Sequence, residues 1–145
     1  MCCSTLFILI LLLIYCGKVG GLFISQFNVP ATALRGEDVT LWCHYKLEMD
    51  TLYSLTWWKD DQQFFRYKPG GRPEKQLYDV QGVKVDTSSM KINSLTLVHV
   101  GLRSTGKYRC EVLADAPSYE KHIQSTNFTV VEQPRGAPRI TGIPE

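Results

Sequence analysis

Apolar and polar residues alternate in short stretches along most of the chain, which is the pattern of β-strands. After residue 22 these stretches are rich in β-branched and aromatic residues. Clusters of Gly, Pro, Asp, Asn or Ser separate them at intervals of about 8 to 12 residues. The pattern predicts strands at residues 23–28, 38–45, 55–59, 64–67, 82–86, 94–98, 107–114 and 123–131. No long segment shows the helical period of about 3.6 residues. We therefore expect an all-β fold.

The alternation turns Cys43 and Cys110 inward from two different strands, since each shares its face with apolar neighbours two residues away. Trp57 lies 14 residues after Cys43, and Tyr108 lies two residues before Cys110. In an immunoglobulin sandwich, cysteines of strands B and F join the sheets, a strand C tryptophan packs on the disulfide, and a tyrosine at this spacing forms the tyrosine corner. The four residues together predict an immunoglobulin-like β-sandwich. The cysteine separation of 67, with extra strand material between residues 64 and 86, favours the variable type.

The chain opens with an unbroken apolar run of 11 residues, from Leu6 to Cys16, and small residues follow it. A helix that spans a bilayer needs about 20 apolar residues, whereas a secretory signal needs about 7 to 15 and small residues at the cleavage site. We predict a signal peptide at residues 1–21, cleavage before Leu22, and a secreted or extracellular location. The segment before the apolar run has no Lys or Arg, so an uncleaved signal anchor is the alternative.

Cleavage at that point removes three of the five cysteines. Cys43 and Cys110 then enter an oxidising compartment as the only pair, which predicts a disulfide between them. Two buried free thiols, as in cytosolic cores, are the alternative. Closing a loop of this length would stabilise the fold by about 4 kcal/mol in the chain-entropy model.

Residues 22–132 are predicted to form one variable-type domain. Residues 133–145 contain too many Pro and Gly residues for another strand of the same sheet. We interpret this segment as a linker toward a second immunoglobulin domain beyond residue 145.

The chemistry of the chain argues against an enzyme. His44, His99 and His122 do not form an evident set of acid, base and nucleophile, and we find no glycine loop for phosphate, nucleophile elbow or spaced Cys/His metal set. Asp60 and Asp61 adjoin in an expected turn, a commoner role for aspartate than a calcium site. With 16 basic and 14 acidic residues, the net charge of +2 is too small for a nucleic-acid-binding surface. We expect no catalysis, cofactor, metal or nucleic-acid partner.

Asn127, Phe128 and Thr129 form the single acceptor sequon for N-glycosylation. Phe128 is expected to point into the core, so the alternation turns Asn127 toward solvent. We predict a glycan on Asn127 in the secreted protein.

Several segments together resemble the Beaten path family. They are residues 52–61 (LYSLTWWKDD), 64–69 (FFRYKP), 82–86 (GVKVD), 106–112 (GKYRCEV) and 114–117 (ADAP). The similarity covers nearly the whole predicted mature chain, and Trp58 stands where the family often has tyrosine. Members of this family are secreted or membrane-attached axon-guidance proteins with two immunoglobulin domains, and they bind receptors of the Sidestep family.

The resemblance implies heterophilic binding to Sidestep-like immunoglobulin-superfamily receptors in axon guidance and synaptic partner recognition. Association with a membrane would then be indirect, through a receptor or through a C-terminal anchor outside this sequence. An alternative function comes from a basic hairpin, whose residues are Arg66, Lys68, Arg72 and Lys75. Such a cluster is most often a solvated turn, but it suits a soluble immune-type protein that binds polysaccharide.

The alternation also predicts where a protein partner would bind. Because Trp57 faces the core, Thr56 and Trp58 should point outward. The same alternation on the neighbouring strand, residues 107–114, should turn Arg109, Glu111 and Leu113 outward. If Phe64 fills the core, the next strand adds two aromatic residues to this outer face; the alternative is that one of them packs as ordinary core. The predicted partner-binding residues are Trp58, Phe65, Tyr67, Arg109, Glu111 and Leu113.

Overall fold

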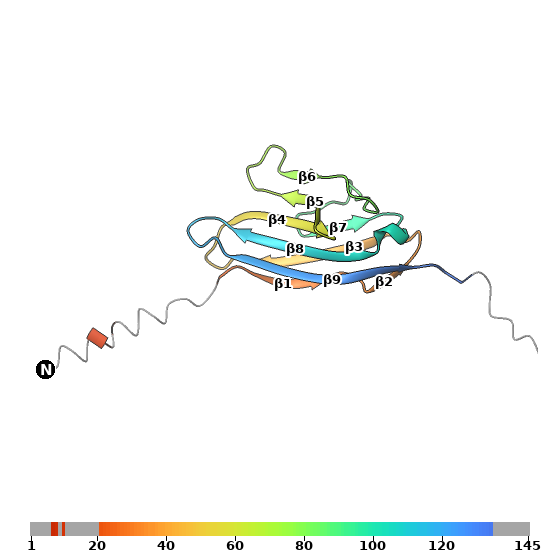
Figure 1. Ribbon diagram of the computed structural model, residues 1–145. Coiled ribbons are helices and arrows are strands. Elements are labelled where there is room, and N and C mark those ends of the chain that lie inside the picture. The colour runs from red at the N-terminus through yellow and green to blue at the C-terminus, as the bar shows by residue number, and fades with distance from the viewer. Residues whose placement is uncertain (1–6, 9, 11–20, 135–145) are drawn as a thin grey trace, which may run out of the picture.

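The structure is a computed structural model that describes residues 7–8, 10 and 21–134 (Figure 1). The predicted signal peptide, except for residues 7, 8, 10 and 21, and the predicted linker after residue 134 lie outside these residues. Among the described helical residues there is no helix long and apolar enough to cross a membrane.

Two β-sheets pack on each other. The smaller sheet has the order β1-β3-β7, and its strands are β1 (Phe23–Asn28), β3 (Val39–Lys46) and β7 (Ser94–Leu97). The larger sheet has the order β2-β9-β8-β4-β5-β6, and its strands are β2 (Thr32–Leu34), β4 (Leu52–Lys59), β5 (Gln62–Tyr67), β6 (Lys75–Leu77), β8 (Gly106–Ala114) and β9 (Lys121–Val131). Only the pair β2–β9 is parallel among these strands. The β5–β6 hairpin forms one edge of the larger sheet (Figure 1).

The residues that predicted the fold meet in its core. A disulfide joins Cys43 on β3 to Cys110 on β8, and so links the two sheets. Trp57 is fully buried between the sheets. The Tyr108 hydroxyl donates a hydrogen bond of 2.6 Å to the backbone oxygen of Ser104, which lies in the short 3₁₀ helix η1 (Leu102–Ser104) before β8. This bond is the tyrosine corner, and the variable-type sandwich is confirmed.

The strand predicted at residues 82–86 is wrong, because this segment forms only two isolated bridges, Val80 with Val83 and Val85 with Leu97. Gly82 has a positive φ of 81°, which turns the chain out of an extended path. Its carbonyl oxygen accepts a hydrogen bond of 2.6 Å from the Ser104 hydroxyl instead of a ladder bond. The other seven predicted strands are present, while β2 and β6, of three residues each, were not predicted.

Candidate functional site

The outer face of the larger sheet is the side turned away from Trp57, and strand register places its residues in rows. Ser125, Arg109, Trp58 and Gln63 lie side by side on β9, β8, β4 and β5. The next row consists of Ile123, Glu111, Thr56, Arg66 and Gln76. A third row includes Lys121, Leu113 and Ser54. Of the predicted partner-binding residues, this face therefore brings together Trp58, Arg109, Glu111 and Leu113, all of them half-buried.

The outward placement predicted for Phe65 is wrong, because its side chain is fully buried. A β-bulge causes the difference: Trp57 pairs with Phe65 but Trp58 pairs with Gln63, so Phe64 is an extra residue in β5. Both phenylalanines consequently point into the core. The Phe64 ring lies 6.4 Å from the ring of Trp57, centroid to centroid.

Tyr67 also faces the core side rather than the outer face. It pairs with Leu55, which is fully buried, and its half-buried ring packs against the core. It lies near Tyr45 on the smaller sheet, whose pKa is raised by burial and by the neighbouring Tyr67. The outer face of β5 therefore carries Arg66 where the alternation predicted an aromatic surface.

Trp58 and Arg109 form the centre of the outer face. The guanidinium carbon of Arg109 lies 4.9 Å from the centroid of the Trp58 ring, within the range of a cation–π contact. Nη1 of Arg109 also donates to Oδ1 of Asp61 at 3.1 Å. Arg109 thus contacts the indole ring of Trp58 and bonds at the same time to Asp61 in the β4–β5 turn.

The β4–β5 turn confirms the prediction of a turn at Asp60 and Asp61. Both residues have positive φ angles, 47° and 65°, which suits the two-residue turns that join antiparallel strands. Oδ1 of Asp60 accepts the backbone N–H of Lys107 at 2.8 Å. That hydrogen bond lowers the pKa of Asp60, and Lys59 lowers it further. The turn is therefore fixed to β8, which supports the position of Arg109.

A second cation–aromatic pair was not predicted from the sequence. Nζ of Lys68 lies 4.6 Å from the centroid of the Tyr53 ring and 3.2 Å from its hydroxyl. The hydrogen bond and charge of Lys68, together with the charge of Arg66, lower the pKa of Tyr53. Tyr53 lies at a register shift between Leu52 and Ser54, so simple alternation does not assign its side chain to a face.

Thr56 lies in the outer-face row as predicted, yet it is only 6% exposed. Its register partners on either side are Glu111 and Arg66, whose longer side chains flank it. The middle of the face therefore carries one acidic and one basic side chain on opposite sides of a small residue.

The sequence model of the immunoglobulin domain matches residues 29–120, which is more than half of the chain. The chain belongs to the immunoglobulin domain family. Its structure is similar to murine CRIg (16% identity, 79% of this chain and 100% of that one, TM-score 0.53). It is also similar to domain 1 of VCBP3 from Branchiostoma floridae (20% identity, 75% and 93%, TM-score 0.55). A third similar structure is the first immunoglobulin-like domain of human CD48 (17% identity, 87% and 95%, TM-score 0.54). A search of curated proteins by sequence finds no match.

In this immunoglobulin domain, Asn127 is exposed on β9 and Phe128 is fully buried, so the predicted orientation of the sequon is confirmed. Asn127 pairs with Lys107 on β8 and belongs to the same outer face as Trp58. Glycosylation itself stays a prediction.

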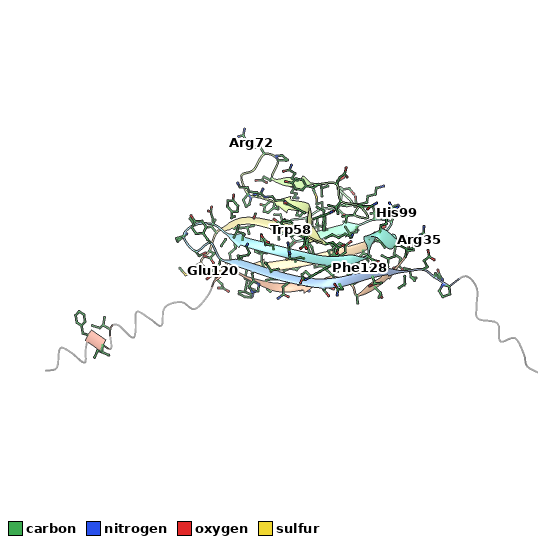
Figure 2. The ribbon with its side chains drawn as sticks, viewed as in Figure 1. Arg35, Trp58, Arg72, His99, Glu120 and Phe128 are labelled. Atoms are coloured by element: carbon green, nitrogen blue, oxygen red, sulfur yellow. A yellow bond between two sulfur atoms is a disulfide. The ribbon has the colours of Figure 1, made fainter. Side chains whose placement is uncertain are left out.

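The basic hairpin of the domain is partly engaged in internal contacts. Lys68 contacts Tyr53, and Nζ of Lys75 donates to the backbone oxygen of Met90 at 3.2 Å. Arg66 and Arg72 line a shallow hollow of about 230 Å³ in this hairpin. Arg72 stands at its tip (Figure 2).

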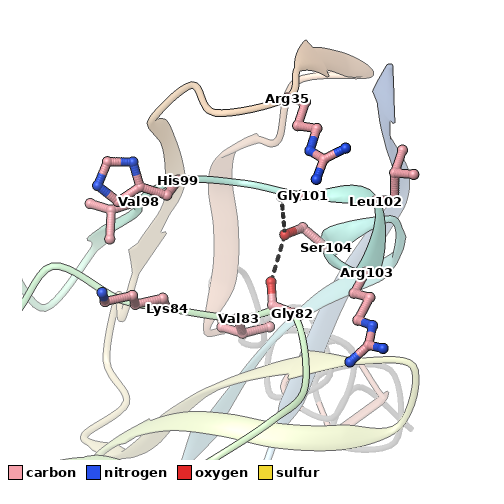
Figure 3. Close-up of a pocket in the computed structure, with 10 residues that line it drawn as sticks. All are labelled: Arg35, Gly82, Val83, Lys84, Val98, His99, Gly101, Leu102, Arg103 and Ser104. Carbon is pink, nitrogen blue, oxygen red and sulfur yellow. Dashed lines mark hydrogen bonds between the residues drawn. The ribbon is translucent and has the colours of Figure 1, made fainter. Parts of the chain in front are cut away.

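A larger hollow of about 480 Å³ lies around η1, at the end of the domain opposite to Glu120 (Figures 2 and 3). Its rim carries Arg35, Lys84, His99 and Arg103. The hydroxyl of Ser104 accepts the backbone N–H of Gly101 and donates to Gly82, which ties the two walls together. Arg35 is paired with Glu132 at 2.7 Å.

Two of the three histidines of the domain make contacts that link neighbouring elements. His44 stacks on Trp42 and shares a hydrogen bond of 2.9 Å with Asn93. Nδ1 of His122 accepts the backbone N–H of Ile24 at 3.0 Å, which links β9 to β1. Within residues 7–8, 10 and 21–134, there is no group of three or more His, Cys, Asp or Glu side chains that could hold a metal ion.

Proposed function

We propose that this protein is an extracellular recognition molecule that binds a protein partner through the outer face of its larger sheet. The observation that carries the proposal is the stacked pair of Trp58 and Arg109 at the centre of that face. Tryptophan, tyrosine and arginine are the residue types most enriched at binding hot spots. Arg109 is already fixed by Asp61, so less side-chain freedom would be lost on binding.

The proposed partner is a Sidestep-like receptor of the immunoglobulin superfamily. This choice rests on the resemblance of residues 52–69 and 106–117 to the Beaten path family. Glu111 and Arg66 lie on either side of Thr56, so the face offers both signs of charge around its aromatic centre. Such a pattern suits a partner surface with complementary charges and disfavours one that is uniformly charged.

The predicted signal peptide and the disulfide support an extracellular location for this interaction. A glycan on Asn127 would limit the binding surface on one side. Asn127 lies two strands away from Trp58 and one row further along the sheet. With the usual distances between strands and between residues of a strand, the two residues are about 12 Å apart. The partner would therefore approach over β8, β4 and β5 and away from the Asn127 end.

The test is a comparison of Trp58→Ala with Trp42→Ala. Trp42 is a matched control because it is a surface tryptophan, 36% exposed, on β3 of the other sheet. We expect Trp58→Ala to weaken binding to a Sidestep-like ectodomain by about 2 kcal/mol or more, roughly 30-fold in Kd. Trp42→Ala should bind like the wild type. Surface plasmon resonance on secreted proteins measures both, and wild-type affinity of Trp58→Ala would exclude this face.

A second candidate function is the binding of an acidic polysaccharide, because Arg66 and Arg72 line a common hollow. A glycan array run beside the receptor assay separates the two. In the polysaccharide case, Arg72→Gln would remove glycan binding and added salt would weaken it strongly. Receptor binding that survives Arg72→Gln but not Trp58→Ala supports the protein partner.

A further inference from the structure

Two carboxylates from different loops face the start of the predicted mature chain. The backbone nitrogen of Leu22 donates a hydrogen bond of 2.9 Å to Oδ2 of Asp50, in the loop between β3 and β4. A side chain placed on Gly21 would collide with the carboxylate of Glu120, which lies at the end of the loop between β8 and β9. Leu22 itself is only 4% exposed, so the core fixes the position of its nitrogen.

We propose that cleavage before Leu22 releases an α-ammonium group that forms an ion pair with Asp50. In this step a signal peptidase hydrolyses the Gly21–Leu22 amide. The oxygen of water bonds to the Gly21 carbonyl carbon, the C–N bond breaks, and both protons of water end on the Leu22 nitrogen, which leaves a carboxylate on Gly21 and an ammonium group on Leu22. An α-amine has a pKa of about 7.7 to 8.0 and is mostly protonated at neutral pH. The neutral N–H donor to Asp50 thereby becomes a charged one, which makes a stronger hydrogen bond.

The position of the cut decides whether this pair can form. A start after Leu22 would remove a buried side chain and the donor nitrogen together. A start before Leu22 would leave an uncharged amide beside Asp50 and would place the ammonium group nearer Glu120 or in solvent. Only cleavage before Leu22 therefore places the new ammonium group beside the carboxylate of Asp50.

The pair would also stabilise the loops at this end of the domain. The backbone N–H of Asp115 donates to the oxygen of Thr51 at 2.7 Å, so the two loops are already bonded to each other. Each carries one strongly exposed apolar residue, Met49 at 91% and Tyr119 at 68%. An ion pair between the Leu22 ammonium group and Asp50 would give the β3–β4 loop a second contact, in addition to its bond with the β8–β9 loop.

The test uses the full chain secreted by eukaryotic cells, with its own signal sequence. Mass spectrometry identifies the first residue, and acetylation by an N-hydroxysuccinimide ester at pH 7 measures how fast the α-amine reacts. An opposite charge in contact raises the pKa of an amine by about one unit or more, which lowers its reactive fraction about tenfold. We expect a start at Leu22 and an α-amine that reacts about tenfold more slowly in the wild type than in Asp50→Asn.

Glu48→Gln is the matched control, because it removes the same charge from an exposed position in the same loop. It should react like the wild type. A second variant with Ala-Gly inserted before Leu22 keeps the hydrogen bond from the Leu22 amide N–H to Asp50 but moves the ammonium group, and its α-amine should react as fast as that of Asp50→Asn. A different first residue in the wild type, or equal rates in the wild type and Asp50→Asn, would overturn the proposal. Slow acetylation of the extended variant would overturn it too.

Discussion

Replacing Tyr108 by phenylalanine removes a single buried hydrogen bond and leaves the packing of the ring in place. The Tyr108 ring is fully buried, and its centroid lies 6.0 Å from that of Phe64 and 5.7 Å from that of Phe128. The hydroxyl bonds to the backbone oxygen of Ser104, a residue that is 3% exposed. Phenylalanine would therefore leave a buried carbonyl without this donor.

The expected cost follows from these two effects. A typical hydrogen bond contributes about 0.5 to 1.5 kcal/mol net, and a buried acceptor that loses its partner costs about 1 to 3 kcal/mol. We expect Tyr108→Phe to lower the free energy of unfolding by about 2 kcal/mol. For a domain of this size, that corresponds to a fall in Tm of about 8 °C.

Urea and thermal unfolding, followed by tryptophan fluorescence, measure the change. Tyr53→Phe is the matched control, because its hydroxyl bonds to Lys68 at a half-exposed site and should contribute little. A difference below about 0.5 kcal/mol between Tyr108→Phe and the wild type, which is the usual size of a neutral surface change, would refute the assigned role of this bond.

The unfolding free energies of the wild type and of Tyr108→Phe should depend differently on pH. Burial, and secondarily the charge of Asp60, raises the pKa of Tyr108 above its ordinary value. A group with a raised folded-state pKa contributes stability that is fully present below its unfolded pKa, about 10, and is lost above it. The advantage of the wild type over Tyr108→Phe should therefore shrink above pH 10. An advantage that stays constant from pH 8 to 11 would contradict the cause assigned to the shift.

Three further predictions concern other positions. In urea unfolding, Gly82→Ala should destabilise the domain by more than Gly36→Ala. Both glycines have a positive φ, but a Cβ at Gly82 would collide with the backbone before β8, whereas a Cβ at Gly36 would meet no atom within 4 Å. Equal losses of unfolding free energy in the two variants would contradict this reasoning. Asn127→Gln should remove the mobility shift that endoglycosidase produces in the wild type, and a wild type that endoglycosidase does not shift would contradict the glycan. Thiol labelling of the denatured, unreduced secreted protein should find no reaction at Cys43 or Cys110, and stoichiometric labelling of both would exclude the disulfide.

The core of this fold could be predicted because regular alternation holds where its residues lie. Cys43 and Cys110 occupy uninterrupted strands, so their inward phase could be counted directly from neighbours two residues away. The spacing of Trp57 and Tyr108 from them then defined the sandwich. The same counting placed Asn127 outward correctly, since β8 and β9 pair without a register shift.

The outer face was harder to predict because its strands contain irregularities that the sequence does not mark. The bulge at Phe64 is defined by the pairing of β5 with β4, which the alternation within β5 alone does not show, so one extra residue reversed the expected orientation of Tyr67. The pair of Tyr53 and Lys68 likewise depends on a register shift. At Gly82 the tertiary bond from Ser104 overrides an apolar pattern that is typical of a strand.

The bulge in β5 also lets one strand add a side chain to the core without changing the surface. Phe65, Arg66 and Tyr67 lie opposite Trp57, Thr56 and Leu55, and the register beyond the bulge would be the same without the extra residue. Deletion of Phe64 would therefore remove one fully buried aromatic ring and leave Arg66 on the outer face. In domains built on this sheet, the filling of the core and the chemistry of the outer face can thus change independently of each other.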